Sequence, residues 1–419
     1  MPTVASVQRS GEPPGLAGTA KPGTEQLRRQ NLLAVLSALR RVGPQSHTDL
    51  SIVTGLASAT VTAVTADLER AGVIERQEQT MSGGRGRPRV LFARRRSFAY
   101  AATVQISSDV VHYALADYDG TLIDRFSARR DLSGTPVAFL AELAAALQRL
   151  LERSRLKPQD LAALSLSSKG IVDADGGRLV WSPVFGERVV DFSLLLQDLP
   201  GAELSISNET LLVAHAQASR RLADRQAPDF SGLVTLSLGH SIGLGIARPD
   251  GRGGLAVTAP NFGHMLNAVD DRLCRCGSRG CIEATAGFYG ILRLAFQVPL
   301  DTIPAKFVPL PELEKIAQSA RQGARMAQYA FRQAGLALGQ GLSRVLSLHE
   351  DMPICVTGPG TRFYDLLSGG IEEGLRQSLH VRLNGLPHIE IDADEATLVS
   401  DGHIDRALAA VDQRVTALR

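Results

Sequence analysis

The sequence predicts an α/β protein in which an N-terminal winged helix-turn-helix precedes a two-lobed body. Three observations support this prediction. The 419 residues exceed what one hydrophobic core normally contains, so two or three domains are expected. Three short amphipathic segments and a hairpin pattern occupy residues 24–96. From residue 97 onward, two strand-rich blocks are each followed by helical segments, which is typical of a duplicated α/β body.

The N-terminal region contains a tail and then regular elements. Residues 1–23 are rich in Pro and Gly and are predicted to be a disordered tail. Helices are predicted over 24–43, 47–54 and 58–71, because apolar residues recur there at helical spacing and glycines end the segments. "VIERQE" and "RVLFA" are predicted strands on either side of "SGGRGRP". Three short helices followed by a hairpin form the plan of a winged helix-turn-helix.

Charge is unevenly distributed along the chain. Residues 24–96 contain twelve Lys or Arg and six Asp or Glu, a net charge of +6, although the whole chain carries only +2. Residues 97–419 carry a net charge of −5. A basic segment on an acidic body suggests a polyanionic partner for that segment alone. Chance surface charge is the alternative, but the winged-helix pattern favours a DNA-binding domain at 24–96 and a separate body at 97–419.

The third predicted helix is the element expected to read DNA, because the major groove of B-DNA accepts one helix. Its outward residues near the N-terminus are small, so the helix can lie deep in the groove. Their hydroxyl groups suit phosphates or base edges, and their methyl groups suit thymine. None is a long side chain that contacts a base through two hydrogen bonds, so other elements are expected to supply much of the specificity. The candidate DNA-binding residues on this helix are Ser58, Ala59, Thr60, Thr62 and Ala63.

The loop of the hairpin is expected to contact the minor groove. "GRGRP" places Arg85 and Arg87 on a flexible, glycine-containing wing. Two guanidinium groups suit the negative potential of a narrow A·T-rich minor groove. The alternative is a solvated basic hairpin beside a structural three-helix module. The helix-turn-helix pattern, the wing and the local charge together favour double-stranded DNA as the partner.

Cysteine usage indicates the compartment. Four cysteines in 419 residues do not form a disulfide framework, and a reducing cytoplasm fits them better. The sequence contains no run of about 18 apolar residues, so no membrane span is predicted. The N-terminal stretch lacks the apolar segment of a secretion signal. We therefore expect a cytoplasmic protein. Three cysteines lie within "CRCGSRGC", whereas Cys355 lies in a separate apolar strand.

The body carries a motif that resembles a known family. Gly263-His264 is followed by "CRCGSRGCIE", and the ROK family (repressor, open reading frame, kinase) is marked by a GH pair, a gap and CxCGxxGCxE. The resemblance spans residues 24–419. It implies a body with the actin-like, ribonuclease-H-like fold of the hexokinase type. The winged helix-turn-helix resembles the repressor branch of the family, which includes xylose and N-acetylglucosamine repressors.

The clustered cysteines and the histidine before them are candidate metal ligands. Three thiolates and one imidazole suit tetrahedral zinc. With four protein ligands no position remains for water, so the zinc is expected to be structural. Gly277 and Gly280 allow the loop to fold back toward the ion. Redox chemistry or coincidence is the alternative, and the family motif favours zinc. The predicted ligands are His264, Cys274, Cys276 and Cys281.

The resemblance also implies a sugar pocket. In the family the metal loop orders one wall of this pocket, and the metal-binding His and the Glu after the last Cys face the sugar. Taken alone, Glu283 would be a helix-start residue favoured by the helix dipole. The ExGH motif of the family appears here with Asn261 in place of Glu, so we expect a small carbohydrate-like effector with altered preference, or another ligand. The predicted effector-binding residues are Asn208, Glu209, Asn261, His264 and Glu283.

Three motifs that the family's kinases need for phosphoryl transfer are altered, so we expect no enzymatic activity. The DxGGT-like loop reads "QISSD" at 105–109, with an acid where a Thr hydroxyl is expected. The GTGxGxG-like loop reads "GHSIGLG" at 239–245, and we expect a tight turn between strands there. Glu209 replaces the catalytic Asp of an Asn-Asp pair and is one methylene longer. A displacement of ~1 Å can cost about a hundredfold in rate.

Two further stretches are interpreted as architecture. "PICVTGPGTRF" resembles the strand and turn with which the family contacts adenosine, and it keeps Gly358 and Gly360. A long helical run is predicted from Pro311 to about His349. Its small residues, among them Gly335 and Gly339, favour close helix packing.

These features predict a DNA-binding transcription regulator of carbohydrate-related genes, first of all a repressor, that acts as a homodimer or homotetramer. Effector binding between the lobes is expected to change the lobe angle and to move the paired winged helices out of register with the DNA. Two alternatives remain. One is a bifunctional sugar kinase that also binds DNA. The other is a scaffold that responds to another protein instead of a small molecule.

Overall fold

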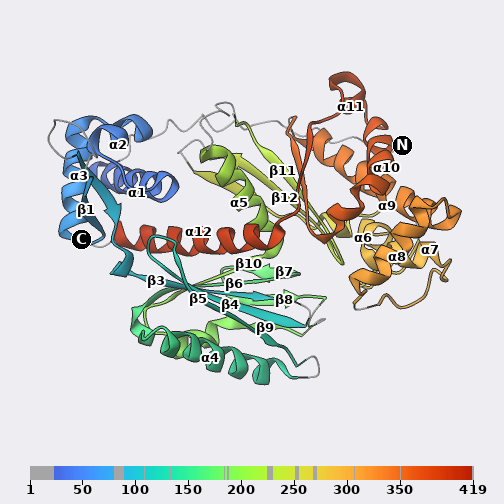
Figure 1. Ribbon diagram of the computed structural model, residues 1–419, viewed down its shortest axis with the longest axis horizontal. Helices are drawn as coiled ribbons and strands as arrows, with labels where there is room; N and C mark the ends of the chain where they lie inside the picture. The colour runs from blue at the N-terminus through green and yellow to red at the C-terminus, as the bar shows by residue number, and fades with distance from the viewer. Residues whose placement is uncertain are drawn as a thin grey trace, which may run out of the picture.

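A computed structural model gives the arrangement of the chain, which Figure 1 shows as a ribbon. The predicted tail lies almost entirely outside the described residues, and so does the loop of the wing. The described residues are 23–79, 89–107, 109–131, 134–183, 185, 188–223, 230–250, 254–267, 271–305, 307–349 and 351–417.

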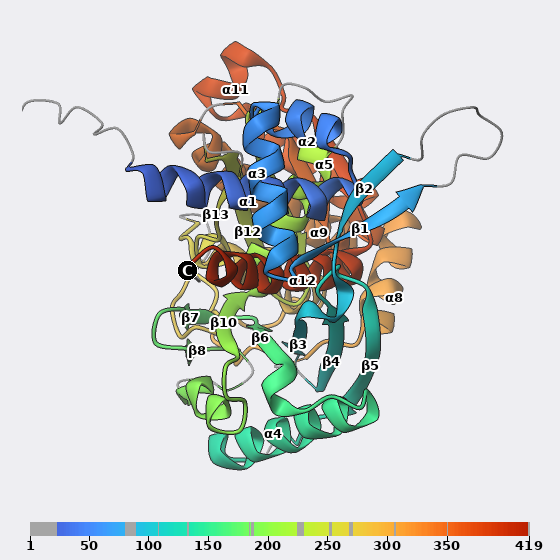
Figure 2. The same ribbon diagram turned by 90° about the vertical axis from the view of Figure 1, so that its left-hand side faces the viewer.

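The N-terminal module consists of three helices and a hairpin (Figure 2), and each predicted element is present with bounds that differ by one residue at most. Ser46 caps the second helix, since its side chain accepts a hydrogen bond from the backbone N–H of Asp49 and the Asp49 carboxylate accepts one from the backbone of Ser46. The elements are α1 (Thr24–Val42), α2 (His47–Thr54), α3 (Ser58–Arg70), β1 (Ile74–Gln79) and β2 (Arg89–Arg94). Of the apolar residues predicted to face inward, Val53 is half-buried and the others are buried, namely Leu32, Val35, Leu36, Leu39, Leu50, Val61, Val64 and Leu68.

The body contains two five-stranded sheets with the same topology, as the duplicated pattern predicted. In each sheet three consecutive antiparallel strands are followed by two parallel strands that add beside the first. The first sheet has the order β10-β6-β3-β4-β5 and the second β13-β12-β11-β14-β15. The bounds in the first lobe are β3 (Tyr100–Ile106), β4 (Val110–Asp117), β5 (Leu122–Arg129), β6 (Leu161–Ser168) and β10 (Glu203–Asn208); those in the second are β11 (Leu233–Leu238), β12 (Ile242–Pro249), β13 (Leu255–Thr258), β14 (Ile354–Thr357) and β15 (Ile389–Asp392).

Helices cover both sheets and fill the space between them (Figure 1). The outer face of the first sheet is covered by α4 (Pro136–Arg153), and a small sheet of β7 (Ile171–Asp173), β8 (Arg178–Trp181) and β9 (Val190–Asp191) lies beside it. The other helices are α5 (Glu209–Ala223), α6 (Ile282–Ala286), α7 (Phe288–Ala295), α8 (Leu310–Arg321), α9 (Arg325–Leu348), α10 (Tyr364–Arg376), α11 (Leu379–Asn384) and α12 (Glu395–Val415). Short 3-10 helices span Arg96–Phe98, Pro158–Asp160, Phe192–Gln197, Phe262–His264 and Pro359–Phe363.

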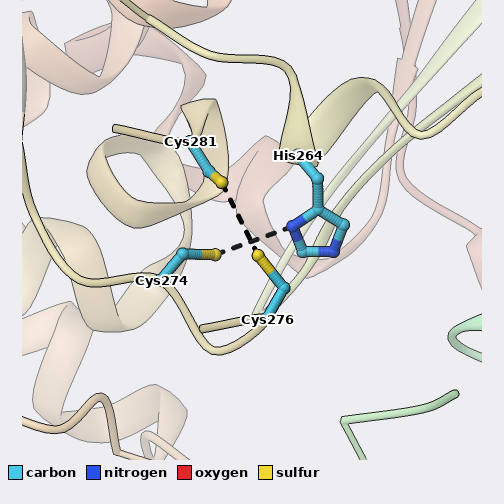
Figure 3. A group of neighbouring side chains, drawn as sticks. All are labelled: His264, Cys274, Cys276 and Cys281. Atoms are coloured by element: carbon cyan, nitrogen blue, oxygen red, sulfur yellow. Dashed lines mark hydrogen bonds between the residues drawn. The ribbon is translucent and has the colours of Figure 1, made fainter. Parts of the chain in front are cut away.

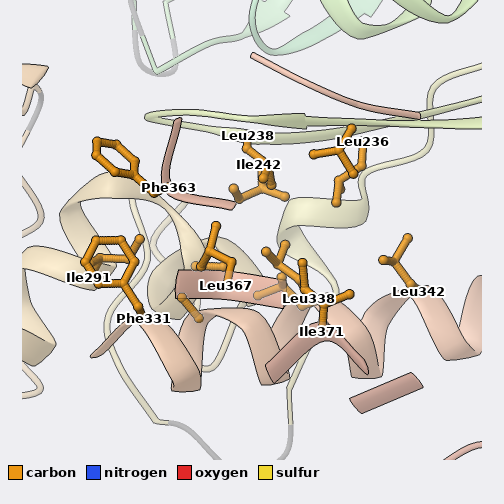
Figure 4. Packing of buried hydrophobic residues seen from close by; sticks show 14 of the residues in the cluster. Leu236, Leu238, Ile242, Ile291, Phe331, Leu338, Leu342, Phe363, Leu367 and Ile371 are labelled. Carbon is orange, nitrogen blue, oxygen red and sulfur yellow. The ribbon is translucent and has the colours of Figure 1, made fainter. Parts of the chain in front are cut away.

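The helical run predicted from Pro311 to His349 is two helices, so that expectation was wrong in one respect. Gly323, with φ of +94°, ends α8, and α9 begins two residues later because a continuous helix cannot pass through this conformation. The expected close packing involves α9 and α10. A Cβ added at Gly335 would lie 2.2 Å from the carbonyl oxygen of Leu367, so the two backbones touch. Figure 4 shows the core between these helices and the second sheet.

The C-terminal helix α12 lies between the two lobes and reaches the N-terminal module (Figures 1 and 2). Near its N-terminal end Leu398 and Val399 pack against α5. Toward its C-terminal end Leu408 and Val411 share one core with α1, α3 and the first strand of the body. Among the described residues no single helix is long and apolar enough to cross a membrane; only α2 and α3 taken together, bent by 113° at their junction, meet that length and composition.

Candidate functional site

The N-terminal half of α3 presents an exposed surface of small side chains. Four of the five predicted DNA-binding residues are exposed and Thr60 is half-buried, on the side opposite the core residues Val61 and Val64. The hydroxyl of Thr62 donates to the carbonyl of Ser58 across 2.9 Å, so its lone pairs and its methyl group remain for a partner. The exposed residues are Ser58, Ala59, Thr62 and Ala63.

The predicted wing contacts, Arg85 and Arg87, lie outside the described residues. The hairpin beneath them is described up to its last pair, Gln79 opposite Arg89. At its base Arg76 pairs with Glu69 of α3 at 2.8 Å. The described part of the hairpin is therefore fixed to α3.

The four predicted metal ligands lie together (Figure 3). Their ligand atoms all lie within 4.8 Å of one another. Nδ1 of His264 is 3.6 Å from Sγ of Cys274, and Sγ of Cys276 is 3.7 Å from Sγ of Cys281. Cys274 and Cys281 are buried, whereas Cys276 and His264 are partly exposed. This cluster has the residue types and the spacing to hold a metal ion.

The loop around the cluster is shaped by its glycines and by Tyr289. Gly277 and Gly280 have φ of +88° and +72°, conformations that other residues rarely adopt, and they return the chain toward Cys274 as predicted. The hydroxyl of Tyr289 lies 3.4 Å from the Cys274 sulfur and donates to Glu283 across 3.4 Å. Hydrogen bonding from Cys281 holds the pKa of the Cys274 thiol far below its usual range, and the same interaction raises the pKa of Cys281, so Cys274 is the first of the two thiols to ionise.

A pocket with a volume of about 690 Å³, including its open mouth, lies between the two lobes. All five predicted effector residues line it, although they come from three separate segments of the chain. The structure also adds lining residues that the sequence did not indicate. The predicted lining residues are Asn208, Glu209, Asn261, His264 and Glu283, and the added ones include Lys169, Trp181, Ser237 and Glu395.

The Asn208-Glu209 pair stands where β10 ends and α5 begins. Asn208 donates to the carbonyl of Gly170 across 2.7 Å and accepts from the backbone N–H of Thr210 across 2.9 Å. It thereby joins the end of the strand to the start of the helix. Oε1 of Glu209 accepts from Gln105 across 3.2 Å, and burial raises the pKa of the Glu209 carboxyl against the opposing effect of Lys169.

The wall next to the metal cluster is formed by Glu283 and His264. Glu283 is 3% exposed, accepts from the backbone N–H of Ile242 across 3.3 Å, and has its pKa raised by burial. The ring of Trp181 meets the ring of His264 edge-on, with 5.5 Å between the ring centres. The metal cluster is therefore linked to the pocket through both an imidazole and the Tyr289–Glu283 hydrogen bond.

A sequence pattern could have predicted one of the added pocket residues but not another. Lys169 directly follows β6, and a charged residue at the carboxyl end of a buried strand is a recognisable signal for a pocket residue. Glu395 is the first residue of α12, where an acid is expected for helix stability alone, so nothing in the sequence marks it as a pocket residue. The hydroxyl of Ser237 donates to the Glu395 carboxylate.

The stretch that replaces the second phosphate loop is the expected turn between two strands, β11 and β12. His240 turns inward, where its ring stacks on Phe307 with 4.8 Å between centres and its Nε2 lies 2.6 Å from the carbonyl of Val308. Burial lowers the pKa of His240 to about 4. Glycines 243 and 245 are needed for packing, since an added Cβ would meet Thr210 at 2.1 Å and Ala214 at 2.4 Å.

A buried ionic junction connects the N-terminal module with the body, and the sequence analysis did not predict it. Asp412 of α12 pairs with Arg40 of α1 and lies 3.5 Å from Arg94 of β2. Arg94 is fully buried, and burial lowers its pKa and brings that of Arg40 to about 10. The three residues come from opposite ends of the chain, so no local pattern could have identified the junction.

Comparisons with known proteins match this architecture. Residues 102–391 match the sequence profile described as the ROK family. The Escherichia coli K12 protein named DNA-binding transcriptional repressor Mlc is 25% identical over 362 residues, which cover 84% of this chain and 86% of that protein. A xylose repressor of Caldicellulosiruptor bescii is 22% identical over 358 residues, covering 84% of this chain and 88% of that protein.

Solved structures show the same fold. A ROK family transcriptional regulator described as a homologue of E. coli Mlc superimposes with a TM-score of 0.70 at 20% identity, covering 93% of this chain and 98% of that chain. A ROK family glucokinase from Streptomyces griseus, in complex with glucose and AMPPNP, gives a TM-score of 0.53 at 21% identity and covers 74% of this chain and 99% of that chain. The predicted fold class is thus confirmed: a winged helix-turn-helix followed by a two-lobed, actin-like body of the ribonuclease-H-like, hexokinase type.

Proposed function

The chain belongs to the ROK family, and on that premise we propose that it is a DNA-binding transcription regulator, a repressor of carbohydrate-related genes. The observation that carries this proposal is the three helices and two hairpin strands of a winged helix-turn-helix, described apart from the wing loop, packed on a ROK body with the small side chains of α3 exposed. Matched relatives that cover both parts are named as repressors, two of them Mlc and a xylose repressor. The regulator acts in the cytoplasm on a double-stranded operator. Residues 24–96 serve as the DNA-binding domain and 97–419 as the effector-binding and dimerisation body.

DNA binding in this proposal uses two elements of each module. The helix α3 enters the major groove with Ser58, Ala59, Thr60, Thr62 and Ala63, and the wing places Arg85 and Arg87 in the minor groove. A homodimer or homotetramer presents two such modules to half-sites separated by whole turns of DNA. The small size of the α3 side chains supports close approach to the bases.

The metal in this proposal is one structural zinc ion. Zinc–sulfur bonds of about 2.3 Å and a zinc–nitrogen bond of about 2.0 Å, arranged as a tetrahedron, require sulfur–sulfur distances of about 3.8 Å and sulfur–nitrogen distances of about 3.5 Å. The observed 3.7 Å between Cys276 and Cys281 and 3.6 Å between Cys274 and His264 agree with both values. These two distances, and the 4.8 Å within which all four ligand atoms lie, support a zinc ion at this cluster. A bound ion would fix the loop that carries His264 and Glu283 into the pocket.

The effector in this proposal is a small, sugar-like molecule in the pocket between the lobes. Carboxylates, amides and imidazoles are suitable partners for sugar hydroxyl groups, and the five residues Asn208, Glu209, Asn261, His264 and Glu283 supply them. The single tryptophan, Trp181, adds an aromatic surface for the apolar face of a ring. In this proposal the pocket binds the effector and does not phosphorylate it. Gln105 stands where the family's kinases have a carboxylate, and His240 in the second loop contacts the carbonyl of Val308.

The helix α12 is the proposed route from effector to DNA. Its first residue, Glu395, lines the pocket and bonds to Ser237 of the second lobe, while Asp412 near its other end holds Arg40 and Arg94. Its 21 residues span about 30 Å as one rigid body. A change in lobe angle at the pocket is therefore transmitted to the winged helix. The effector can shift the equilibrium between the two shapes only by as much as its affinities for them differ.

Operator binding by the full-length protein tests this function. DNA fragments tiled across its own genome are titrated at low ionic strength. One or a few fragments are expected to bind about 10³-fold or more tightly than the rest, which is the usual ratio of specific to non-specific DNA affinity. The variant Ala59→Glu, which places a charge on α3 against phosphate, is expected to abolish binding. The matched variant Ala145→Glu on the exposed side of α4 is expected to bind as wild type. A wild-type protein that binds no fragment refutes the proposal.

A further inference from the structure

The exposed side of α3 continues beyond the five residues assigned to DNA binding. Successive residues of a helix are rotated by about 100°, so four exposed residues of α3 fall within one strip about 60° wide, opposite its core residues. Figures 1 and 2 show α3 on the outer side of the module, with α1 between it and the lobes. An inference about this strip rests on the proposed function, which places α3 in the major groove. The four residues are Ala59, Ala63, Ala66 and Arg70.

Arg70 is the one long hydrogen-bonding side chain in this strip, because the other three residues are alanines. Its side chain is 76% exposed. A helical side chain leans toward the N-terminus of its own helix, so Arg70 extends back over the turn that contains Ala66. The small side chains of Ala63 and Ala66 leave this side of the helix open to a partner.

Asp67 holds Arg70 by a single nitrogen. Oδ1 of Asp67 accepts a hydrogen bond from Nη1 of Arg70 across 2.9 Å, and Oδ2 accepts one from Nη2 of Arg28 in α1 across 3.0 Å. One carboxylate therefore joins two guanidinium groups and is anchored to a neighbouring helix. The hydrogen bond from Arg28 is the main cause that lowers the pKa of the Asp67 carboxyl, so this carboxylate is ionised at neutral pH.

One edge of the Arg70 guanidinium remains available. A guanidinium has five N–H donors, and Arg70 donates one of them, at Nη1, to Asp67. Within the part of the chain that the structure describes, Nε and Nη2 of Arg70 make no hydrogen bond or ion pair. The neighbouring Arg76 shows what this edge can bind, because its Nε and Nη2 contact the two carboxylate oxygens of Glu69 at 2.8 Å each.

We propose that Arg70 binds a guanine in the major groove through its Nε and Nη2, with Asp67 as the positioning residue that orients it. Guanine presents two acceptors there, N7 and O6, and an arginine that donates to both is the commonest specific contact to DNA. Adenine places a donor beside its N7, and the pyrimidines lack a second acceptor. Asp67 fixes the plane of the guanidinium before DNA binds, so less side-chain entropy is lost in the complex.

Selection of binding sites from random double-stranded DNA by the full-length protein tests this contact. Wild type is expected to prefer guanine at one position of each half-site by about tenfold or more, as a contact through two hydrogen bonds implies. Arg70→Lys keeps the charge but loses the planar edge, so it is expected to lose most of this preference while the salt dependence of binding stays as in wild type. A contact to phosphate would give the opposite pattern: Arg70→Ala would keep every base preference and reduce the magnitude of the salt slope by about 0.9 per module.

Asp67→Ala tests the positioning role. The variant leaves Arg70 in place without its partner, so the guanine preference is expected to fall by about threefold or more. Affinity for random DNA is expected to rise, because Arg28 and Arg70 both lose a carboxylate. Asp67→Asn keeps an oxygen acceptor for Arg70 and is expected to retain more of the preference than Asp67→Ala.

The matched control is Arg376→Ala, which breaks an exposed pair with Glu372 on α10 and is expected to change neither base preference nor salt dependence. Exposed ion pairs contribute little to stability, so all variants are expected to fold, and circular dichroism checks this.

The inference is wrong if Arg70→Lys selects the same bases as wild type at every position, or if Arg70→Ala changes only the salt dependence. An unchanged guanine preference in Asp67→Ala would show that Asp67 does not position Arg70. A wild-type protein that selects DNA without any preference that depends on Arg70 refutes only this inference. A wild-type protein that selects no DNA refutes the proposed function as well.

Discussion

The hydroxyl of Tyr118 donates a hydrogen bond of 2.6 Å to Oδ1 of Asp412. This contact joins the end of β4 to the C-terminal helix, and both side chains are almost completely buried. The guanidinium of Arg94 lies 3.9 Å from the centre of the Tyr118 ring, and Arg40 pairs with the same carboxylate from the other side. One acidic residue near the end of the chain thus holds two arginines of the DNA-binding module against the body.

Replacing Asp412 with Asn should destabilise the junction strongly. The change leaves Arg40 and Arg94 buried without their carboxylate, and removing one partner of a buried ion pair costs about 3–5 kcal/mol. Unfolding by urea, followed by circular dichroism, measures the loss. Asp401→Asn on the same helix is the control, because Asp401 is 44% exposed and pairs with Arg220 at the surface, where about 0–1 kcal/mol is expected. Equal losses in both variants would show that the junction contributes no more than a surface pair.

Replacing Cys276 with Ser should remove most of the zinc. A structural site depends on all four ligands, and a serine hydroxyl is a much weaker zinc ligand than a thiolate. Elemental analysis of the purified protein measures the zinc-to-protein ratio, and a shift in Trp181 fluorescence reports the loosened wall at His264. Cys355→Ala, in the buried strand β14, should keep its zinc. Full zinc content in Cys276→Ser would contradict the ligand assignment.

Removing the wing arginines should flatten the salt dependence of DNA binding. Each Lys or Arg that neutralises a phosphate contributes about 0.9 to the magnitude of the slope of log affinity against log salt concentration. The double variant Arg85→Ala with Arg87→Ala should therefore reduce that magnitude by about 2 per module. Fluorescence anisotropy at several salt concentrations measures the slope. Arg332→Ala with Arg376→Ala, which removes two exposed arginines of α9 and α10, should leave it unchanged. An unaltered slope in the wing variant refutes the role of the wing.

The protein should not phosphorylate sugars. Gln105 donates to Glu209 across 3.2 Å, so the residue in the position of the catalytic base is held by a neutral amide, and the stretches at 105–109 and 239–245 depart from the phosphate-loop motifs of the family's kinases. A coupled assay for ADP over a panel of hexoses and amino sugars measures turnover, with a ROK family glucokinase as the positive control. ATP-dependent turnover by the wild-type chain, lost in Glu209→Gln, would establish the kinase alternative.

Stability should fall as the pH drops below about 6.5, partly because of His403. Its ring nitrogens lie 2.8 Å from the hydroxyls of Ser165 and Ser167, and burial, reinforced by Arg406, lowers its pKa from 6.5 to about 3. Between these two values the unfolded chain binds a proton that the folded chain does not, so folding stability is lost on acidification. From pH 7 to pH 5 this residue alone should cost about 2 kcal/mol.

The variant His403→Gln isolates that contribution. Glutamine keeps polar atoms for the two serines but does not titrate, so its stability should depend less steeply on pH than that of wild type. His240 has a lowered pKa of the same sign, and the variant's slope should therefore not reach zero. Chemical denaturation at pH 7, 6 and 5 measures both slopes. Parallel slopes would show that His403 does not control the acid sensitivity.

Local signals predicted the DNA-binding module because each of its elements is decided within a few residues. Apolar residues at helical spacing and the Ser46 cap specify the short helices wherever they are placed in the fold. Local reasoning was wrong at Gly323. The apolar pattern predicted one continuous helix there, but the positive φ of Gly323 separates two helices. Local reasoning identified the turn at 239–245. It did not explain Gly243 and Gly245, which are needed because Thr210 and Ala214 of α5 lie against them.

By itself the sequence determined the local elements, the duplicated order of strands and the four ligand-type side chains around Cys274, because these depend on spacing along a short stretch of chain. Only the tertiary structure decided which charges face one another. Arg94 and Asp412 are 318 positions apart, and Lys169 and Glu395 line the same pocket only because α12 returns between the lobes. Such pairs leave no periodic pattern, since their energy depends on burial and distance, and both are set by the packing of the whole chain.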